Sequence, residues 1–124
     1  MGKLSGKVAI VTGGAGFIGS HMVDLLVEND FEVRVIDNLI GGREENLSHH
    51  GNDAVKFERR DIRSLDPGDS FFQQAKFVFH FAGIGDIVPS IEKPLDYMSA
   101  NVQGTVHVLE CCRHAGVQKL VYAA

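Results

Sequence analysis

A glycine-rich turn between an apolar run and an amphipathic segment restricts the possible folds of this chain more than any other feature. The turn, Thr12–Gly19, has the sequence TGGAGFIG and follows the β-branched run Val8–Val11. From Phe17 to Asn29, apolar residues recur at the spacing of one helix face. Glycine lets the backbone turn tightly and approach another group without a Cβ in the way. The order of strand, glycine turn and helix therefore predicts an α/β fold built on parallel strands.

The rest of the chain repeats this alternation of strands and helices. Gly116 is expected to end a second long helix. Right-handed crossovers then predict a Rossmann-type doubly wound parallel sheet with strand order 3-2-1-4-5, truncated after the fifth strand. The remaining predicted segments are strands at Glu32–Asp37, at Val55–Arg59 with an end near Asp61-Ile62, at Phe77–Ala82 and at Lys119–Ala124, the long helix at Met98–Cys112, a loop with one helical turn at Asn38–Asn52, and a short helical turn at Phe71-Phe72.

Composition argues against several classes of partner. The 124 residues carry a formal net charge of −4, and no run of Lys or Arg is longer than Arg59-Arg60, so nucleic acid would meet no broad positive surface. The apolar run near the N-terminus is far too short to span a membrane. The two cysteines, Cys111 and Cys112, are adjacent within a predicted helix, where a disulfide between them would be strained. We therefore expect a cytoplasmic protein with reduced thiols that binds neither nucleic acid nor membranes.

The surroundings of the glycine turn predict a dinucleotide site. Backbone N–H groups and the partial positive charge at a helix start can hold a pyrophosphate, and Gly13, Gly16 and Gly19 occupy that junction. Asp37 ends the second predicted strand, 18 residues after Gly19, where a carboxylate can accept hydrogen bonds from the adenosine ribose. A glycine turn alone is often only a turn, but the strand, the helix and Asp37 together favour a dinucleotide.

The same carboxylate indicates which dinucleotide is bound. A negative charge on Asp37 would repel a 2′-phosphate, which favours NAD over NADP. Arg43, six residues further on, could instead clamp such a phosphate, although a solvated loop charge is the more ordinary interpretation.

Several spaced motifs resemble those of the extended short-chain dehydrogenase/reductase family, and within it the NAD-dependent nucleotide-sugar epimerases and dehydratases. The resemblance covers the chain from Lys7 onwards. The motifs, in chain order, are the glycine turn extended to His21, Asp37–Leu39, Arg60–Arg63, His80–Gly83 and Asn101–Thr105. Residues 1–124 are therefore expected to form the NAD-binding Rossmann domain of such an enzyme, without its catalytic and substrate-binding part.

The resemblance also implies a role for individual residues toward NAD. Phe17 and Ile18 would lie under the pyrophosphate, and Asn101 would face the nicotinamide half. The remaining implied contacts are Asp37 and Asn38 with the adenosine ribose, Asp61 and Ile62 beside the adenine, and Phe81, Ala82 and Gly83 along the middle of the cofactor.

The activity that the resemblance implies is reversible oxidation of a hydroxyl group on a UDP-sugar or another nucleotide sugar. The family's catalytic Ser/Thr and Tyr-x-x-x-Lys are expected beyond Ala124, so no catalytic residue is assigned here and this chain alone is expected to be inactive. The alternatives are a nucleotide-sugar dehydratase or decarboxylase, and a non-catalytic NAD-binding module. The resemblance further implies a homodimer in which the helix Met98–Cys112 pairs with a partner subunit.

Three further histidines have side chains that could act as metal ligands or as a catalytic base. His49 and His50, with Asp53 nearby, could be metal ligands, but adjacent histidines in a polar loop are more often solvated, so no metal is assigned. His80 ends an apolar run and is expected to be a core residue with satisfied hydrogen bonds rather than a catalytic base.

Overall fold

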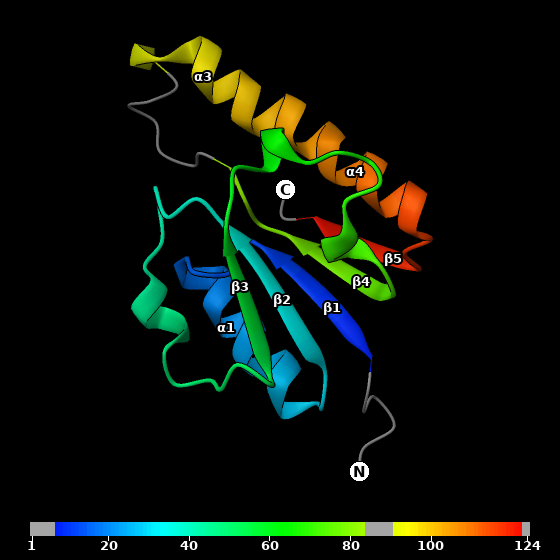
Figure 1. The fold of residues 1–124 in the computed structure, drawn as a ribbon. Coiled ribbons are helices and arrows are strands. Elements are labelled where there is room, and N and C mark those ends of the chain that lie inside the picture. Colours follow the sequence, from blue (N-terminus) through cyan, green and yellow to red (C-terminus); the bar gives the residue numbers. More distant parts are fainter. Residues whose placement is uncertain (1–6, 84–90, 123–124) are drawn as a thin grey trace.

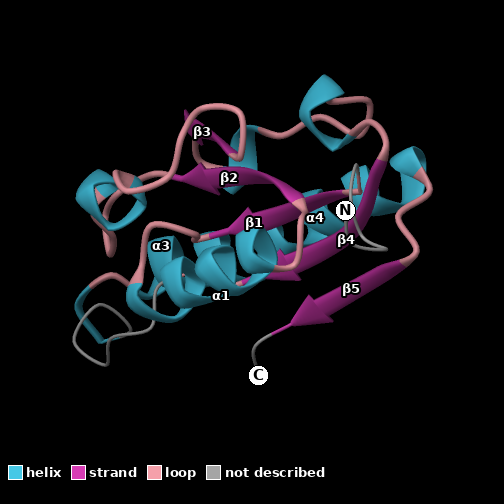
Figure 2. Ribbon diagram, turned by 90° about the horizontal axis from the view of Figure 1, so that it is seen from below, coloured by secondary structure: helices cyan, strands magenta, loops and turns pink. Residues whose placement is uncertain are grey.

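In the computed structural model, the chain forms one parallel sheet with helices on both faces (Figure 1). The structure describes residues 7–83 and 91–122. The strands pair in the order β3-β2-β1-β4-β5, and every pairing is parallel (Figure 2). This order confirms the predicted Rossmann-type topology. The strands are β1 (Val8–Thr12), β2 (Glu32–Asp37), β3 (Val55–Arg59), β4 (Ala75–His80) and β5 (Lys119–Tyr122).

The helices follow the predicted plan. Gly116, in the left-handed conformation with a φ of 71°, ends the last helix and donates its N–H to Cys112. The helical elements are α1 (Phe17–Glu28), α3 (Pro94–Met98), the π-helical segment η4 (Ser99–Gln103), α4 (Gly104–Ala115), and the single 3-10 turns η1 (Glu44–Leu47), η2 (Ile62–Ser64) and η3 (Ser70–Phe72). Within the described residues, no helix is long and apolar enough to cross a membrane.

The core lies on both faces of the sheet because β1 is buried on both sides. Ile10 packs into one cluster of buried residues together with Val108 of α4. Its neighbour Val11 points the other way, into a second cluster that contains Val23 of α1. Successive side chains of a strand alternate between the two faces of the sheet, so α1 covers one face and α4 the other.

Several predicted boundaries differ from the structure: β3 ends at Arg59 rather than near Asp61-Ile62, and β4 begins at Ala75 rather than at Phe77. Strand β4 ends at His80 rather than at Ala82, because Thr12 is the last residue of the neighbouring strand and the N–H of Ala82 turns to the Thr12 hydroxyl instead. The long helix begins at Pro94, four residues before Met98, and passes through a π-helical segment before α4. The last two residues of the predicted fifth strand lie outside the described residues.

Candidate cofactor-binding cleft

A cleft of about 210 Å³ opens at the carboxyl ends of β1, β2, β3 and β4. Open parallel sheets bind ligands at this edge, where the order of strands reverses, and the reversal here lies between β1 and β4. The predicted site residues that line the cleft are Gly13, Gly16, Asp37, Asn38, Asp61, Ile62, Phe81, Ala82 and Gly83. The structure therefore brings together, in one cleft, residues drawn from four different strand ends.

Two glycines of the turn are required by the fold itself. Gly13 has a φ of 71°, and a Cβ there would lie 2.8 Å from the backbone nitrogen of Ala82. A Cβ on Gly19 would overlap the carbonyl oxygen of Gly13, so this glycine lets α1 approach the end of β1. Both contacts are far closer than carbon atoms tolerate. Gly19 acts from behind the turn and is not part of the cleft lining.

Gly16 differs from these two glycines because the protein leaves room for a side chain there. The nearest atom to a Cβ at Gly16 would be the Gly13 carbonyl oxygen at 3.4 Å, and the residue has an ordinary φ of −79°. Gly16 lines the cleft. The free space beside it therefore belongs to the cleft and is available to a ligand.

The start of α1 presents backbone N–H groups beside this space. Within the described residues, no side chain hydrogen-bonds to cap this helix, and its first turn contains no acidic residue. An uncapped helix N-terminus of this kind favours an anion. The side chains of Phe17 and Ile18 are 77% and 63% exposed and do not line the cleft, so the first turn can approach a ligand only through its backbone.

The carboxylate of Asp37 is buried and fixed. Oδ2 accepts a hydrogen bond from the Ala15 N–H at 3.0 Å, and Oδ1 accepts one from the Leu39 N–H at 2.8 Å. Each carboxylate oxygen has a second lone pair, so the group can still accept hydrogen bonds from a ligand in the cleft. The next residue, Asn38, accepts from the Ile40 N–H at 3.1 Å and so shapes the same turn.

The wall beyond β3 is held by an arginine that the sequence analysis did not assign to the site. Arg63 lines the cleft and binds both carboxylate oxygens of Asp61, at 2.9 and 2.6 Å. This guanidinium holds the pKa of Asp61 below its usual value. Arg63 also donates to Asp96 of α3 at 3.0 Å and to Ser99 of η4 at 3.2 Å. It therefore joins the wall that carries Asp61 to the helix on the other side of the cleft.

Ile62 lies at the base of the cleft wall that carries Asp61. It is buried in the core cluster beneath α4. A Cβ on Gly104 would overlap the Cδ1 atom of Ile62, so the glycine at the start of α4 lets this helix pack on the wall. Other lining residues that the sequence analysis missed are Ile36, Ile40, Gly41, Arg60, Asp96 and Ala100.

A buried chain of hydrogen bonds supports the cleft from below. Thr12 Oγ1 accepts from the N–H groups of Phe81 and Ala82, both at 3.1 Å, so its own proton goes to Nδ1 of His80 at 2.6 Å. The Nε2–H of His80 then donates to Thr105 Oγ1 at 2.9 Å. His80 is 1% exposed, and burial lowers its pKa to about 4. The expected core position of His80 is thereby confirmed, with a neutral ring of fixed tautomer.

Thr105 extends this chain to the π-helical segment. Its hydroxyl donates to the carbonyl oxygen of Asn101 at 2.8 Å. Asn101 does not line the cleft, but its Oδ1 lies 2.7 Å from the Cβ that Gly83 lacks, and Gly83 has a φ of 155°. The amide of Asn101 is therefore packed against the cleft wall at Gly83, a position that only glycine can occupy.

Arg43 lies outside the cleft lining. Its side chain is exposed, and its backbone N–H donates to the Ala15 carbonyl at 3.0 Å. This contact docks the loop after β2 onto the glycine turn, as does a second one from the Asn46 side chain at 2.7 Å.

Comparison with known proteins places this cleft in a family. Residues 9–124 match the sequence pattern of the NAD dependent epimerase/dehydratase family. The UDP-glucose 4-epimerase of Bos taurus is 38% identical over 129 residues, which cover 93% of this chain and 36% of that protein. The UDP-N-acetylglucosamine 4-epimerase of Methanobrevibacter ruminantium, solved with UDP-N-acetylmuramic acid, superposes with a TM-score of 0.85 at 32% identity, covering 94% of this chain and 37% of that one.

A second solved structure gives the same picture. The UDP-glucose 4-epimerase of Thermus thermophilus, solved in complex with NAD, is 38% identical with a TM-score of 0.78, and the match covers 94% of this chain and 37% of that one. The chain thus spans a little over a third of the length of the relatives it matches. Since the matched pattern takes in the glycine turn, Asp37 and the cleft walls, the chain belongs to the NAD dependent epimerase/dehydratase family.

Proposed function

We propose that this chain is the NAD(H)-binding part of an enzyme that epimerises a nucleotide-activated sugar. One observation carries the proposal: the open side of Gly16, the uncapped start of α1 and the buried Asp37 carboxylate all meet in a single cleft at the switch point of the sheet. The similarity to UDP-sugar 4-epimerases supports this assignment of ligand and reaction.

The residues fit an extended dinucleotide. The pyrophosphate would lie against the backbone of the glycine turn and the first turn of α1, and the adenosine ribose against Asp37 and Asn38. Asp61 and Ile62 would flank the adenine. Phe81, Ala82 and Gly83 would line the middle of the cofactor, and Asn101 would act toward the nicotinamide half through the wall at Gly83.

NAD, when bound, supplies a reversible hydride acceptor for a hydroxyl group of the sugar. The contribution of this chain is to bind and orient it. Asp37 fixes the adenosine end, because its two backbone hydrogen bonds leave the carboxylate only one orientation. The chain from Thr12 through His80 to Asn101 fixes the wall at the other end, because its members come from β1, β4 and η4.

We also propose that the enzyme is a homodimer that pairs through the helix α3–η4–α4. Five apolar side chains recur along this helix at intervals of three or four residues and are 46–86% exposed. They are Leu95, Met98, Val102, Val106 and Leu109. An exposed apolar stripe of this kind marks an interaction surface.

The variant Gly16→Val tests the cofactor site, because its side chain would occupy the cleft but no space that other atoms of the folded chain fill. Titration of the purified chain with NADH, followed by nucleotide fluorescence, should show binding that weakens at least tenfold in this variant. Gly51→Val is the matched control, since a Cβ at Gly51 would meet nothing within 4 Å. Equal NADH affinity in wild type and Gly16→Val, with both proteins folded by circular dichroism, would contradict the proposal.

A further inference from the structure

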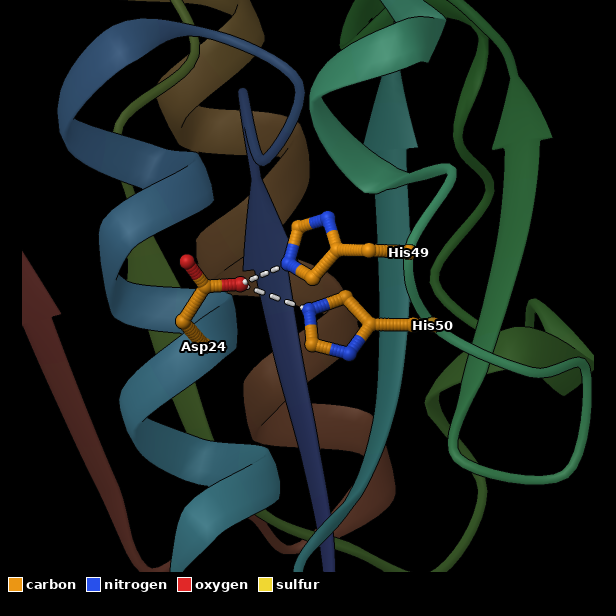
Figure 3. Close-up of side chains that lie close together, drawn as sticks. All are labelled: Asp24, His49 and His50. Carbon is orange, nitrogen blue, oxygen red and sulfur yellow. Dashed lines mark hydrogen bonds and ion pairs between the residues drawn. The ribbon is translucent and has the colours of Figure 1, made fainter.

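Away from the cleft, three side chains from two separate elements converge on one point. Asp24 lies on α1, and His49 and His50 lie in the turn after η1 (Figure 3). Oδ1 of Asp24 is 2.7 Å from Nε2 of His49 and 2.6 Å from Nε2 of His50. The three potential ligand atoms all lie within 4.8 Å of one another.

The fold explains why two adjacent histidines can face the same helix. Adjacent side chains in a strand would point in opposite directions, but here the chain turns, and the N–H of His50 donates to the Leu47 carbonyl at 3.1 Å. Leu47 is buried in the same core cluster as Val23 of α1, so the turn is held against that helix. The two imidazole rings lie 4.0 Å apart and both direct Nε2 to Asp24 (Figure 3).

The third member of the cluster is not the residue that the sequence suggested. Asp53, which is close to the histidines in sequence, is absent from the group that the described residues form. The carboxylate comes instead from Asp24, which lies 25 positions before His49 in the sequence. Only the docking of the loop on α1 creates this combination of two imidazole nitrogens and one carboxylate oxygen.

We propose that Asp24, His49 and His50 form a binding site for Zn²⁺, with solvent as the fourth ligand. Two histidine nitrogens and a carboxylate oxygen are ligands that zinc prefers, whereas Mg²⁺ and Ca²⁺ select sites made of oxygen atoms alone. The presence of three protein ligands and one open side matches a four-coordinate ion at a protein surface.

The geometry requires only a small adjustment. Tetrahedral ligands at about 2.0–2.1 Å from zinc lie roughly 3.3 Å apart, so each histidine nitrogen must move more than half an ångström away from the Asp24 oxygen. The side chain of His50 is 9% exposed and that of His49 is 56% exposed. His50 and Asp24 thus supply the fixed part of the site. The exposed side chain of His49 can move outward to make room for the ion and then coordinate it.

Zinc at this position would join α1 to the loop that follows β2. The first part of that loop lines the cleft at Asn38 and Gly41, and its middle is docked on the glycine turn by Arg43. The ion would hold the far end of the same loop. An ion that binds only the folded state raises stability by mass action, so bound zinc should stabilise the docked loop.

Metal titration of the tag-free chain tests the site directly. The protein, stripped with EDTA and exchanged into reducing buffer, is titrated with Zn²⁺ in competition with a chromophoric chelator. We expect one equivalent of Zn²⁺ to bind, at least tenfold weaker binding in His50→Ala and in Asp24→Asn, and unchanged binding in the control His114→Ala, which removes an exposed imidazole elsewhere. Addition of Zn²⁺ should raise the Tm of wild type and of the control only.

Substitution by Co²⁺ provides a second readout. Four-coordinate Co²⁺ absorbs visible light far more strongly than the six-coordinate aqueous ion, so the wild type should develop intense visible bands that Asp24→Asn lacks. A zinc site formed by the cysteines is a distinct outcome; burial raises the pKa of both thiols to about 11, which disfavours the thiolates that zinc requires. The proposal is overturned if wild type binds no Zn²⁺, or if the affinity is the same in wild type, His50→Ala and Asp24→Asn.

Discussion

At the scale of single residues, Asp37 combines a fixed orientation with a negative charge at the cleft. Its two backbone partners, Ala15 and Leu39, position both carboxylate oxygens. A ribose hydroxyl can donate to this group, whereas a 2′-phosphate would be repelled by it. Arg43, the residue that could have reversed this preference, is exposed and does not line the cleft.

This arrangement predicts a preference for NADH over NADPH of at least tenfold, because a hydrogen bond to a charged group is typically worth about 1.5–3 kcal/mol. The substitution Asp37→Asn should reduce the ratio of the two affinities toward one, while Asp53→Asn, which removes an exposed loop charge, should leave it unchanged. Fluorescence titration with both nucleotides measures the ratio. An unchanged ratio in Asp37→Asn would show that another residue selects the cofactor.

The burial of His80 predicts that the free energy of unfolding depends on pH. Its pKa is about 4 in the folded chain because the ring is buried, and an unfolded histidine titrates near 6.5. Acid therefore protonates the unfolded state first, so the stability associated with neutral His80 is full above pH 6.5 and declines as the pH falls toward 4. The decline amounts to about 3 kcal/mol over that interval.

Urea unfolding between pH 7 and pH 4.5 measures this effect. The variant His80→Asn is expected to be less stable at pH 7, but its stability should change less steeply with pH than that of the wild type. His114→Asn, which changes an exposed histidine of α4, should keep the wild-type slope. Identical slopes in wild type and His80→Asn would rule out a buried neutral His80.

At the scale of elements, the helix α3–η4–α4 carries the proposed dimer surface. The pair Val102→Glu and Val106→Glu places two charges in the middle of its apolar stripe. Analytical ultracentrifugation over a concentration series should show self-association of the wild type and a monomer for the double variant, with no loss of helix content. Leu25→Glu on α1, which is similarly exposed, is the control and should still associate. A wild type that stays monomeric at all concentrations would contradict the proposal.

The elements also show where sequence reasoning succeeds. The glycine turn and Asp37 could be predicted because the strand, the turn and the helix are encoded locally, by residues that follow one another along the chain. The strand order followed from the handedness of the crossovers. The apolar run predicts an end of β4 two residues too late, because the competing acceptor, the Thr12 hydroxyl, lies 70 positions from Ala82 in the sequence.

Contacts between distant segments account for most of what the sequence did not reveal. Arg63 reaches Asp96 across 33 positions, so its place in the cleft wall depends on how α3 packs. Asp24 meets His49 only after the loop docks on α1. The side-chain types alone did not predict either pairing, because each of these residues is equally common on a solvated surface.

At the scale of the whole molecule, the two buried clusters place α1 and α4 on opposite faces of the sheet, and the cleft opens at the carboxyl ends of the strands, between the glycine turn and the segment α3–η4. The chain covers 36–37% of the relatives it matches, so the proposed function assigns turnover of a sugar to an enzyme of their length. Binding of the dinucleotide is the property that the proposed function assigns to this chain.

The most direct test of that claim is a two-dimensional nitrogen–proton NMR titration of the labelled chain with NAD. We predict saturable shifts of the backbone amide signals of Gly13, Gly16, Leu39 and Ala82, which surround the cleft, and unchanged signals around Gly51 on the distant loop. An absence of shifts at millimolar NAD, or shifts confined to residues outside the cleft, would contradict the assignment of this chain as the NAD-binding part of the enzyme.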